Sequence, residues 1–204
     1  MKKLIFDIDN TLIKWEDHYT NGLRKTMKEF NVDYDYKIID KVIESQSTAH
    51  ITLTKEKLLN DINNKTNLNL EINFVERLLE NQKDAAIVDL EIIDTLKYLK
   101  EKYELVILTN YFIDTQIGRL KKAQIYDYFS DFIGGDQIKM KPHIESFQKA
   151  ANGVPSIMIG DSVECDIDGA KKAGLDVIQI DYFNKYENTE HPLIRNISEL
   201  KGLL

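Results

Sequence analysis

The stretch FDIDNTL, residues 6–12, decides the fold of this chain. It begins at the end of an apolar run that starts at Leu4. This run is too short to cross a membrane and has the length of a buried parallel strand. In an extended backbone, a period of two places the carboxylates of Asp7 and Asp9 on one face, with Ile8 pointing into the core. Two like charges held so close require a cation or a shared proton. The alternative interpretation is a solvated turn after an edge strand.

The composition indicates a globular protein in a reducing compartment. The 204 residues suffice for one full domain with a sizeable insertion, or for two small domains. With 27 Lys and Arg against 34 Asp and Glu and no basic cluster, we expect no nucleic acid polymer as a partner. The single cysteine, Cys165, excludes an internal disulfide framework and a cysteine-rich zinc site. No segment approaches the roughly 18 apolar residues of a membrane helix, so we expect a cytoplasmic protein without membrane contact.

After Leu12 the apolar spacing becomes helical and stays so for about seventy residues. This region has no glycine after Gly22 and no strand-like alternation. The spacing predicts four helices, with apolar faces within residues 19–30, 38–43, 58–62 and 72–79. Residues 14–85 are therefore expected to form an inserted all-α subdomain.

The rest of the chain, residues 1–13 and 86–204, alternates strands with helices, which predicts an α/β fold with a parallel sheet covered by helices on both faces. Ser198 is a candidate N-cap of a short helix near the end. The predicted strands lie within 104–110, around Phe132, and within 155–162 and 175–181. The predicted helices lie around 92–99 and at 113–123, 144–151 and 165–173, and the last of them is expected to end at a left-handed Gly174.

Polar residues follow three of these apolar runs directly. Asp7 and Asp9 end the first run, Thr109 and Asn110 end the second, and Asp161 ends the third. In open parallel sheets the ligand crevice lies outside the carboxyl ends of the strands. The sequence therefore predicts one crevice that three strands supply with acids and a hydroxyl.

At these positions the chain resembles the haloacid dehalogenase-like (HAD superfamily) hydrolases with a helical cap inserted after the first motif. The resemblance covers nearly the whole chain and implies a Rossmann-like doubly wound core in residues 1–13 and 86–204 and a helical cap in residues 14–85. The four motifs of the family match, in order, Asp7, Asp9 and Thr11 in DIDNT; Thr109 in LTN; Lys141 in KMKPHIESF; and Gly160, Asp161 and Asp166 in GDSVECDIDGA.

The resemblance implies that Asp7 attacks phosphorus and forms an aspartyl-phosphate, while Asp9 protonates the leaving alcohol and later deprotonates water. It also implies that Lys141, Thr109 and the amide of Asn110 bind the phosphoryl oxygens. Because dehalogenases of the family lack the second aspartate, Asp9 argues against a dehalogenase.

The resemblance further implies Mg²⁺, a cation that prefers oxygen ligands and bridges carboxylates to phosphate. The expected ligands are Asp7, Asp161 and the backbone carbonyl of Asp9, with Asp166 acting through water or by positioning Lys141. Taken alone, Asp166 could instead be a helix-start aspartate.

Some neighbouring residues allow a second interpretation. Lys139 is the alternative to Lys141 if the register differs, and Asp168 falls outside the family pattern and is expected at the surface. Trp15 and Tyr19 follow the first motif and are expected to pack in the core or the cap, with substrate contact as the alternative.

The function that follows is a magnesium-dependent phosphatase acting on a small phosphorylated metabolite, with a nucleotidase, a sugar phosphatase and a phosphoglycolate phosphatase all open. The alternatives are a phosphomutase and a non-catalytic regulatory protein that binds a phosphate ligand. The chain is expected to be a monomer or a homodimer.

Overall fold

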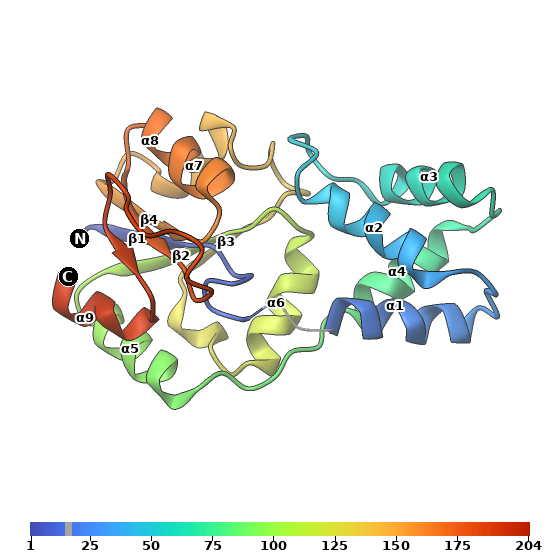
Figure 1. Cartoon of the computed structure of the whole chain (residues 1–204), viewed down its shortest axis with the longest axis horizontal. Coiled ribbons are helices and arrows are strands. Elements are labelled where there is room, and N and C mark those ends of the chain that lie inside the picture. The colour runs from blue at the N-terminus through green and yellow to red at the C-terminus, as the bar shows by residue number, and fades with distance from the viewer. Residues whose placement is uncertain (15–17) are drawn as a thin grey trace.

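The computed structural model describes residues 1–14 and 18–204 and has a six-stranded sheet at its centre (Figure 1). The strand order is β3-β2-β1-β4-β5-β6, and all neighbouring strands pair in parallel. This is the predicted Rossmann-like α/β core, with β1 near its middle. The strands are β1 Lys3–Phe6, β2 Glu104–Leu108, β3 Asp131–Ile133, β4 Ser156–Gly160, β5 Asp176–Ile180 and β6 Leu193–Ile194.

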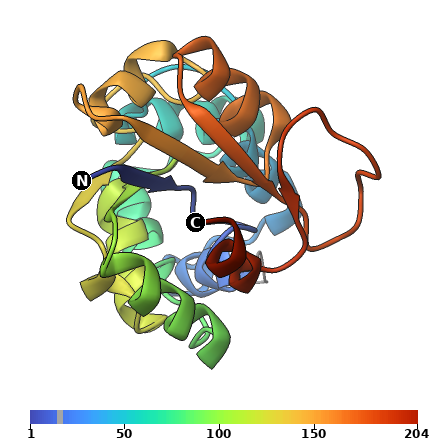
Figure 2. The ribbon, with the colours of Figure 1, turned by 90° about the vertical axis from the view of Figure 1, so that its left-hand side faces the viewer.

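Both faces of the sheet are covered by helices, because every central strand is apolar on both sides (Figures 1 and 2). On β1, Leu4 and Phe6 belong to one buried cluster and Ile5 to the other. Burial of each large apolar side chain of this kind contributes roughly 1.5–3 kcal/mol to the free energy of folding. The first cluster includes residues of α5 Leu90–Lys100, α6 Ile113–Lys122 and α9 Leu200–Leu203, and the second includes residues of α7 Ile144–Ala151, the π-helix η2 Val163–Asp168 and α8 Gly169–Lys172.

The chain leaves β1 through a tight turn that keeps Asp7 and Asp9 at the carboxyl edge of the sheet. Asn10 has a φ of 56°, a left-handed conformation that asparagine tolerates better than most residues. The backbone N–H of Asn10 donates to the carbonyl of Ile13 at 2.8 Å, and the N–H of Ile13 donates to the carbonyl of Ile8 at 2.9 Å. These hydrogen bonds fix the first motif at the edge of the sheet.

Four of the helices between β1 and β2 pack on one another and form a helical subdomain, which we call the cap (Figure 1). Their apolar positions form a third buried cluster, in which Leu23, Leu58 and Phe74 are fully buried and to which Tyr111 and Met140 of the core also belong. The cap helices are α1 His18–Glu29, α2 Tyr36–Gln46, α3 Lys55–Thr66 and α4 Ile72–Asn81. The four predicted helices are confirmed, while the domain boundaries at 14 and 85 stay a prediction. Among the described residues, no helix has the length and apolar character needed to cross a bilayer.

The segment that joins α2 to α3 is hydrogen-bonded to the core. The N–H of Leu53 donates to the carbonyl of Gly135 at 2.7 Å, and the N–H of Met140 donates to the carbonyl of Ile51 at 3.2 Å. The cap is thus attached to the core here as well as through the chain at its two ends.

The helix after β4 differs from the prediction of one helix over residues 165–173. The chain first makes the π-helix η2, and only then the short α8. In this wide turn the carboxylate of Asp166 points toward the residues before η2. Its Oδ2 accepts a hydrogen bond from the N–H of Ser162 at 3.0 Å. Such widened turns recur at functional sites. Gly174 has a φ of +81°, which confirms it as the left-handed residue after the helix.

The N-cap predicted at Ser198 is wrong. A short 3₁₀ helix, η3 Ile197–Glu199, begins after Asn196, whose side chain accepts a hydrogen bond from the N–H of Ser198. Glu199 completes a capping box by accepting from the N–H of Asn196. Asparagine caps helices as well as serine does, so residue preference alone could not separate the two positions.

Candidate active site

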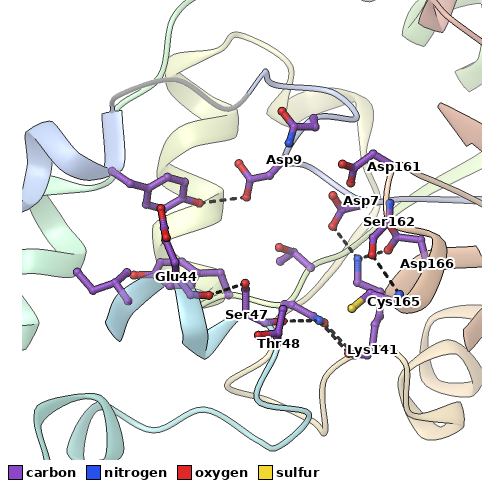
Figure 3. Close-up of a pocket in the computed structure, with 16 residues that line it drawn as sticks. Asp7, Asp9, Glu44, Ser47, Thr48, Lys141, Asp161, Ser162, Cys165 and Asp166 are labelled. Carbon is purple, nitrogen blue, oxygen red and sulfur yellow. Dashed lines mark hydrogen bonds and ion pairs between the residues drawn. The ribbon is translucent and has the colours of Figure 1, made fainter. Parts of the chain in front are cut away.

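The residues predicted for the site lie around one cavity of about 220 Å³ (Figure 3). The cavity lies where the carboxyl ends of β1, β2 and β4 meet the cap. Seven of its lining residues were predicted from the sequence, namely Asp7, Asp9, Thr109, Asn110, Lys141, Asp161 and Asp166. The structure therefore brings all of them together.

Lys141 is the charged centre of this cluster. Its Nζ donates to Asp7 Oδ1 at 2.6 Å and to Asp166 Oδ1 at 2.7 Å, and its side chain is only 2% exposed. Burial lowers the pKa of Lys141, but Asp166 and Asp7 outweigh burial and raise it above its ordinary value. The alternative, Lys139, is exposed and pairs with Glu145 outside the cavity. The register with Lys141 in the site is therefore the one that the structure adopts.

Three carboxylates form a cluster with more negative charge than Lys141 balances. Asp7, Asp161 and Asp166 each place one oxygen within 4.8 Å of the others. Burial, followed by Asp166 and Asp161, raises the pKa of Asp7 well above its ordinary value despite Lys141. Burial and Asp166 also raise the pKa of Asp161 to about 7. An all-oxygen cluster that is unfavourable when fully ionised fits a hard divalent cation such as Mg²⁺.

The two oxygens of Asp166 are already engaged. Oδ1 accepts from Lys141 and Oδ2 accepts from the N–H of Ser162. This arrangement favours positioning of Lys141 over direct metal ligation by Asp166. The carboxylate of Asp166 lies so close to the backbone of residue 160 that glycine is required there, because a Cβ would lie 2.3 Å from Asp166 Oδ2.

Asp9 faces a different group of residues. Its Oδ1 accepts from Arg119 Nη1 at 2.6 Å, and its Oδ2 accepts from Tyr19 Oη at 3.2 Å and from Gln116 Nε2 at 3.1 Å. Gln116 Nε2 also donates to Thr109 Oγ1 at 3.1 Å. Burial lowers the pKa of Arg119, but Asp9 outweighs burial and raises it. Asp9 is thus held by donors from both the core and the cap.

Gln116 and Arg119 were missed from the sequence. Both lie on α6, on the same buried face as Ile113 and Leu120. The signal was two polar side chains at helix positions whose spacing predicts apolar core residues. A buried glutamine and arginine need partners, and Asp9 is the partner here.

Asn110 joins the core to the cap. Its Nδ2 donates to the carbonyls of Ser47 and Lys141, each at 2.9 Å, and its Oδ1 accepts from the N–H of Lys141 at 2.8 Å. The Asn110 side chain is therefore occupied. Among the described residues its backbone N–H has no acceptor, which leaves that group for a ligand.

The cap supplies the wall of the cavity that faces the acids (Figure 3). Ile43, Glu44, Ser47 and Thr48 come from the end of α2 and the residues after it. The sequence predicted Ile43 only as part of the apolar face of a helix and did not single out the other three. Tyr19 lines the cavity too, so the alternative of substrate contact remains for it. Trp15 lies outside the described residues.

Comparisons with known proteins identify a family and several relatives. The family model described as haloacid dehalogenase-like hydrolase matches residues 4–180. The N-acylneuraminate-9-phosphatase of Mus musculus is 26% identical, with 100% of this chain and 94% of the relative covered. The glyceraldehyde 3-phosphate phosphatase of Methanothermobacter thermautotrophicus is 24% identical, with 100% of both chains covered.

A solved structure has the same fold over almost the whole chain. It is the HAD-hydrolase YfnB from Bacillus subtilis bound to magnesium, with a TM-score of 0.76 and 21% identity. The match covers 99% of this chain and 97% of that one. The fold of almost the whole chain thus recurs in a known structure.

Proposed function

The chain belongs to the haloacid dehalogenase-like hydrolase family, and from this premise we propose that it is a magnesium-dependent phosphatase that hydrolyses a small phosphomonoester through a phosphoryl group carried on Asp7. The observation that carries the proposal is the position of Asp7. One of its carboxylate oxygens is held by Lys141 at 2.6 Å, and the other is not used by any described residue. Two relatives that are named as phosphatases support the same chemistry.

In the first step, the free oxygen of Asp7 attacks phosphorus, and the bond from phosphorus to the ester oxygen breaks. Asp9 gives its proton to the leaving alcohol. In the second step, Asp9 takes a proton from water, the water oxygen attacks phosphorus, and the bond from phosphorus to Asp7 breaks. Inorganic phosphate leaves, and both carboxyl groups return to their starting forms.

Lys141 and two uncharged donors stabilise the charge that develops on the phosphoryl oxygens. Lys141 is already oriented by Asp7 and Asp166 before a substrate arrives. The hydroxyl of Thr109 and the backbone N–H of Asn110 come from the end of β2, on the same side of the cavity. Preorganised donors of this kind contribute several kcal/mol to barrier reduction, of order 3 for each, because they need no reorganisation.

The residues that would hold Mg²⁺ are Asp7, Asp161 and the backbone carbonyl of Asp9. When bound, the ion supplies positive charge that allows the phosphate dianion and these acids to share one cavity. Asp166 contributes by holding Lys141. The relative of known structure that is bound to magnesium supports this choice of cation.

The test is phosphate release from a panel of phosphomonoesters with Mg²⁺, with EDTA, and with Asp7→Asn as the control for contaminating phosphatases. Release that requires both the metal and Asp7 supports the proposal. Conversion of a sugar phosphate into an isomer without phosphate release would point to a phosphomutase. A ligand that raises the melting temperature without any turnover would point to a binding protein.

A further inference from the structure

Glu44 presents a carboxylate to the cavity from the side opposite the acids (Figure 3). It lies in the last turn of α2 and its side chain is exposed. Within residues 1–14 and 18–204, no ion pair or hydrogen bond engages its carboxylate. A carboxylate that no described residue engages is therefore available at the point where the part of a substrate beyond the phosphate would lie.

The charges around the cavity disfavour a second anionic group on the substrate. Lys141 is the one cationic side chain among the described lining residues, and Asp7 and Asp166 already bind it. The three residues outside the described part are Trp, Glu and Asp in the sequence, so they add no cation. Arg24, Lys37 and Lys41 line a neighbouring cavity that Glu44 also borders. Within the cavity that holds the acids, a carboxylate on the leaving group would meet Glu44 with no described cationic lining residue other than Lys141, which is a repulsive contact.

The neighbours of Glu44 add further hydrogen-bond acceptors to this wall. Ser47 Oγ donates its proton to the carbonyl of Glu44 at 2.8 Å, and Thr48 Oγ1 donates to the carbonyl of Ser45 at 3.3 Å. Both hydroxyl oxygens keep lone pairs that can accept. Such a wall matches a ligand that carries several donors, as the hydroxyl groups of a sugar do.

The two aromatic residues among the described lining of the cavity, Tyr19 and Tyr111, are packed against other side chains and are not open for stacking on a nucleobase. Tyr19 and Tyr111 pack edge to face with ring centres 5.4 Å apart, and the guanidinium of Arg119 lies over the Tyr19 ring at 4.4 Å. The cavity volume of about 220 Å³ is also below the roughly 300–1,000 Å³ of sites for larger ligands. Both observations favour a small leaving group.

The wall is held in place by the core. Asn110 donates to the carbonyl of Ser47, and a hydrogen bond of 2.8 Å joins His143 Nε2 to the carbonyl of His50. Glu44 is one helical turn before Ser47, so its distance from the acids is set by these contacts.

From this arrangement, and resting on the proposed phosphatase function, we infer that the substrate is the phosphate ester of a small, uncharged polyhydroxy compound, a sugar or polyol monophosphate, and that Glu44 binds its hydroxyl groups. The acceptor-rich wall, the absence of a second cation among the described lining residues and the small volume all select this class.

The experiment compares kcat/KM with Mg²⁺ for three ester classes: sugar and polyol monophosphates, phosphoglycolate, and nucleoside monophosphates. We expect the first class to exceed the other two by about tenfold or more, the factor typical of one charged hydrogen bond. Glu44→Lys should lower kcat/KM for the sugar phosphates by a similar factor and raise it for phosphoglycolate. Glu44→Gln keeps the shape of the side chain without its charge, so its kcat/KM values should lie between those of the wild type and those of Glu44→Lys.

The matched control is Glu101→Lys, which makes the same charge change at an exposed position before β2, at the edge of the sheet opposite the site. It should leave the order of substrates unchanged. A wild-type protein that releases no phosphate from any ester would overturn both the phosphatase and this inference. Release that favours phosphoglycolate or nucleotides, or a Glu44→Lys variant whose order of substrates equals that of Glu101→Lys, would overturn this inference alone. If Glu44→Lys does not fold, the comparison of the three ester classes with the wild-type protein still tests the inferred substrate class.

Discussion

Arg119 Nη1 donates to Asp9 Oδ1 at 2.6 Å across a separation of 110 residues in the chain. The same Nη1 donates to the hydroxyl of Tyr19 at 2.7 Å, and Tyr19 comes from α1 of the cap. Arg119 is only 1% exposed. A buried guanidinium thus connects the proposed acid and base with the cap, which makes Arg119 a candidate for positioning Asp9.

Replacement of Arg119 by alanine should slow the hydrolysis of esters whose leaving group must be protonated. For an alkyl phosphate we expect kcat to fall by about ten- to a hundredfold, since general acid catalysis contributes about 10²–10⁴-fold and the variant misplaces the acid without removing it. For p-nitrophenyl phosphate, whose phenolate leaves without protonation, the loss should be smaller. Steady-state kinetics on both esters measures the ratio.

The control for this variant is Arg77→Ala, which removes a guanidinium that pairs with Glu29 on the exposed surface of the cap. It should leave both rates near wild type. Equal losses on the two esters for Arg119→Ala would contradict a role in positioning Asp9.

Gly160→Ala should damage the site through Asp166. The added Cβ would lie 2.3 Å from Asp166 Oδ2, so Asp166 or the strand end must move. We expect a loss of about 1–3 kcal/mol in the free energy of unfolding, as for other overpacked positions, together with a lower kcat because Lys141 loses its partner. Urea denaturation and steady-state kinetics measure the two effects.

Gly202→Ala is the matched control, since a Cβ there meets nothing within 4 Å. It should keep wild-type activity. A Gly160→Ala variant with wild-type kcat would show that the position of Asp166 does not matter for turnover.

Magnesium should stabilise the folded protein against heat. Burial and the neighbouring carboxylates raise the pKa values of Asp7 and Asp161, and a bound cation stabilises their ionised forms. A ligand bound only by the folded state at a hundred times its Kd adds about 2.7 kcal/mol. Thermal unfolding with and without Mg²⁺ measures the shift. Asp161→Asn should abolish most of it, whereas Asp168→Asn, at an exposed position nearby, should keep it. An unchanged shift in Asp161→Asn would exclude Asp161 as a ligand.

The stability of the cap should fall in acid through Glu29. Hydrogen bonds from Arg77 and Asn81 lower the pKa of Glu29 from 4.5 to about 2. Because the folded state lowers this pKa, the contact stabilises the protein above pH 4.5, and the contribution is lost as the pH falls toward 2. Urea midpoints measured across this range should fall less steeply for Glu29→Gln than for wild type.

The control is Glu101→Gln, at an exposed position with no ion pair among the described residues. Its curve should follow that of wild type. A Glu29→Gln curve that also follows wild type would show that the pair with Arg77 does not contribute to acid stability.

The sheet and the acids of the site were predictable because both depend on local sequence. A run such as Leu4–Phe6 is apolar at every position, which is typical of a short strand buried on both faces. Asp7 and Asp161 follow such runs directly, so the position of the strand also gives the position of the acid.

Contacts between distant segments could not be predicted in the same way. Glu44 has the spacing of a solvated helix face, and its position beside the cavity depends on how α2 packs against the core. The partner of Arg119 is 110 residues away, and only the folded chain shows that it is Asp9. At Ser198 and Asn196 the local signals were nearly equal, so the structure had to decide between them.

Acid-quenched mass spectrometry can detect a phosphoryl group covalently bound to Asp7. The Mg²⁺-loaded protein is mixed with a phosphomonoester that it hydrolyses, quenched during turnover and digested. We predict that the peptide containing Asp7 gains the mass of one phosphoryl group, and that Asp7→Asn shows neither this peptide nor phosphate release. An Asp7→Asn variant that is folded and still releases phosphate at a substantial rate would contradict a covalent role for Asp7.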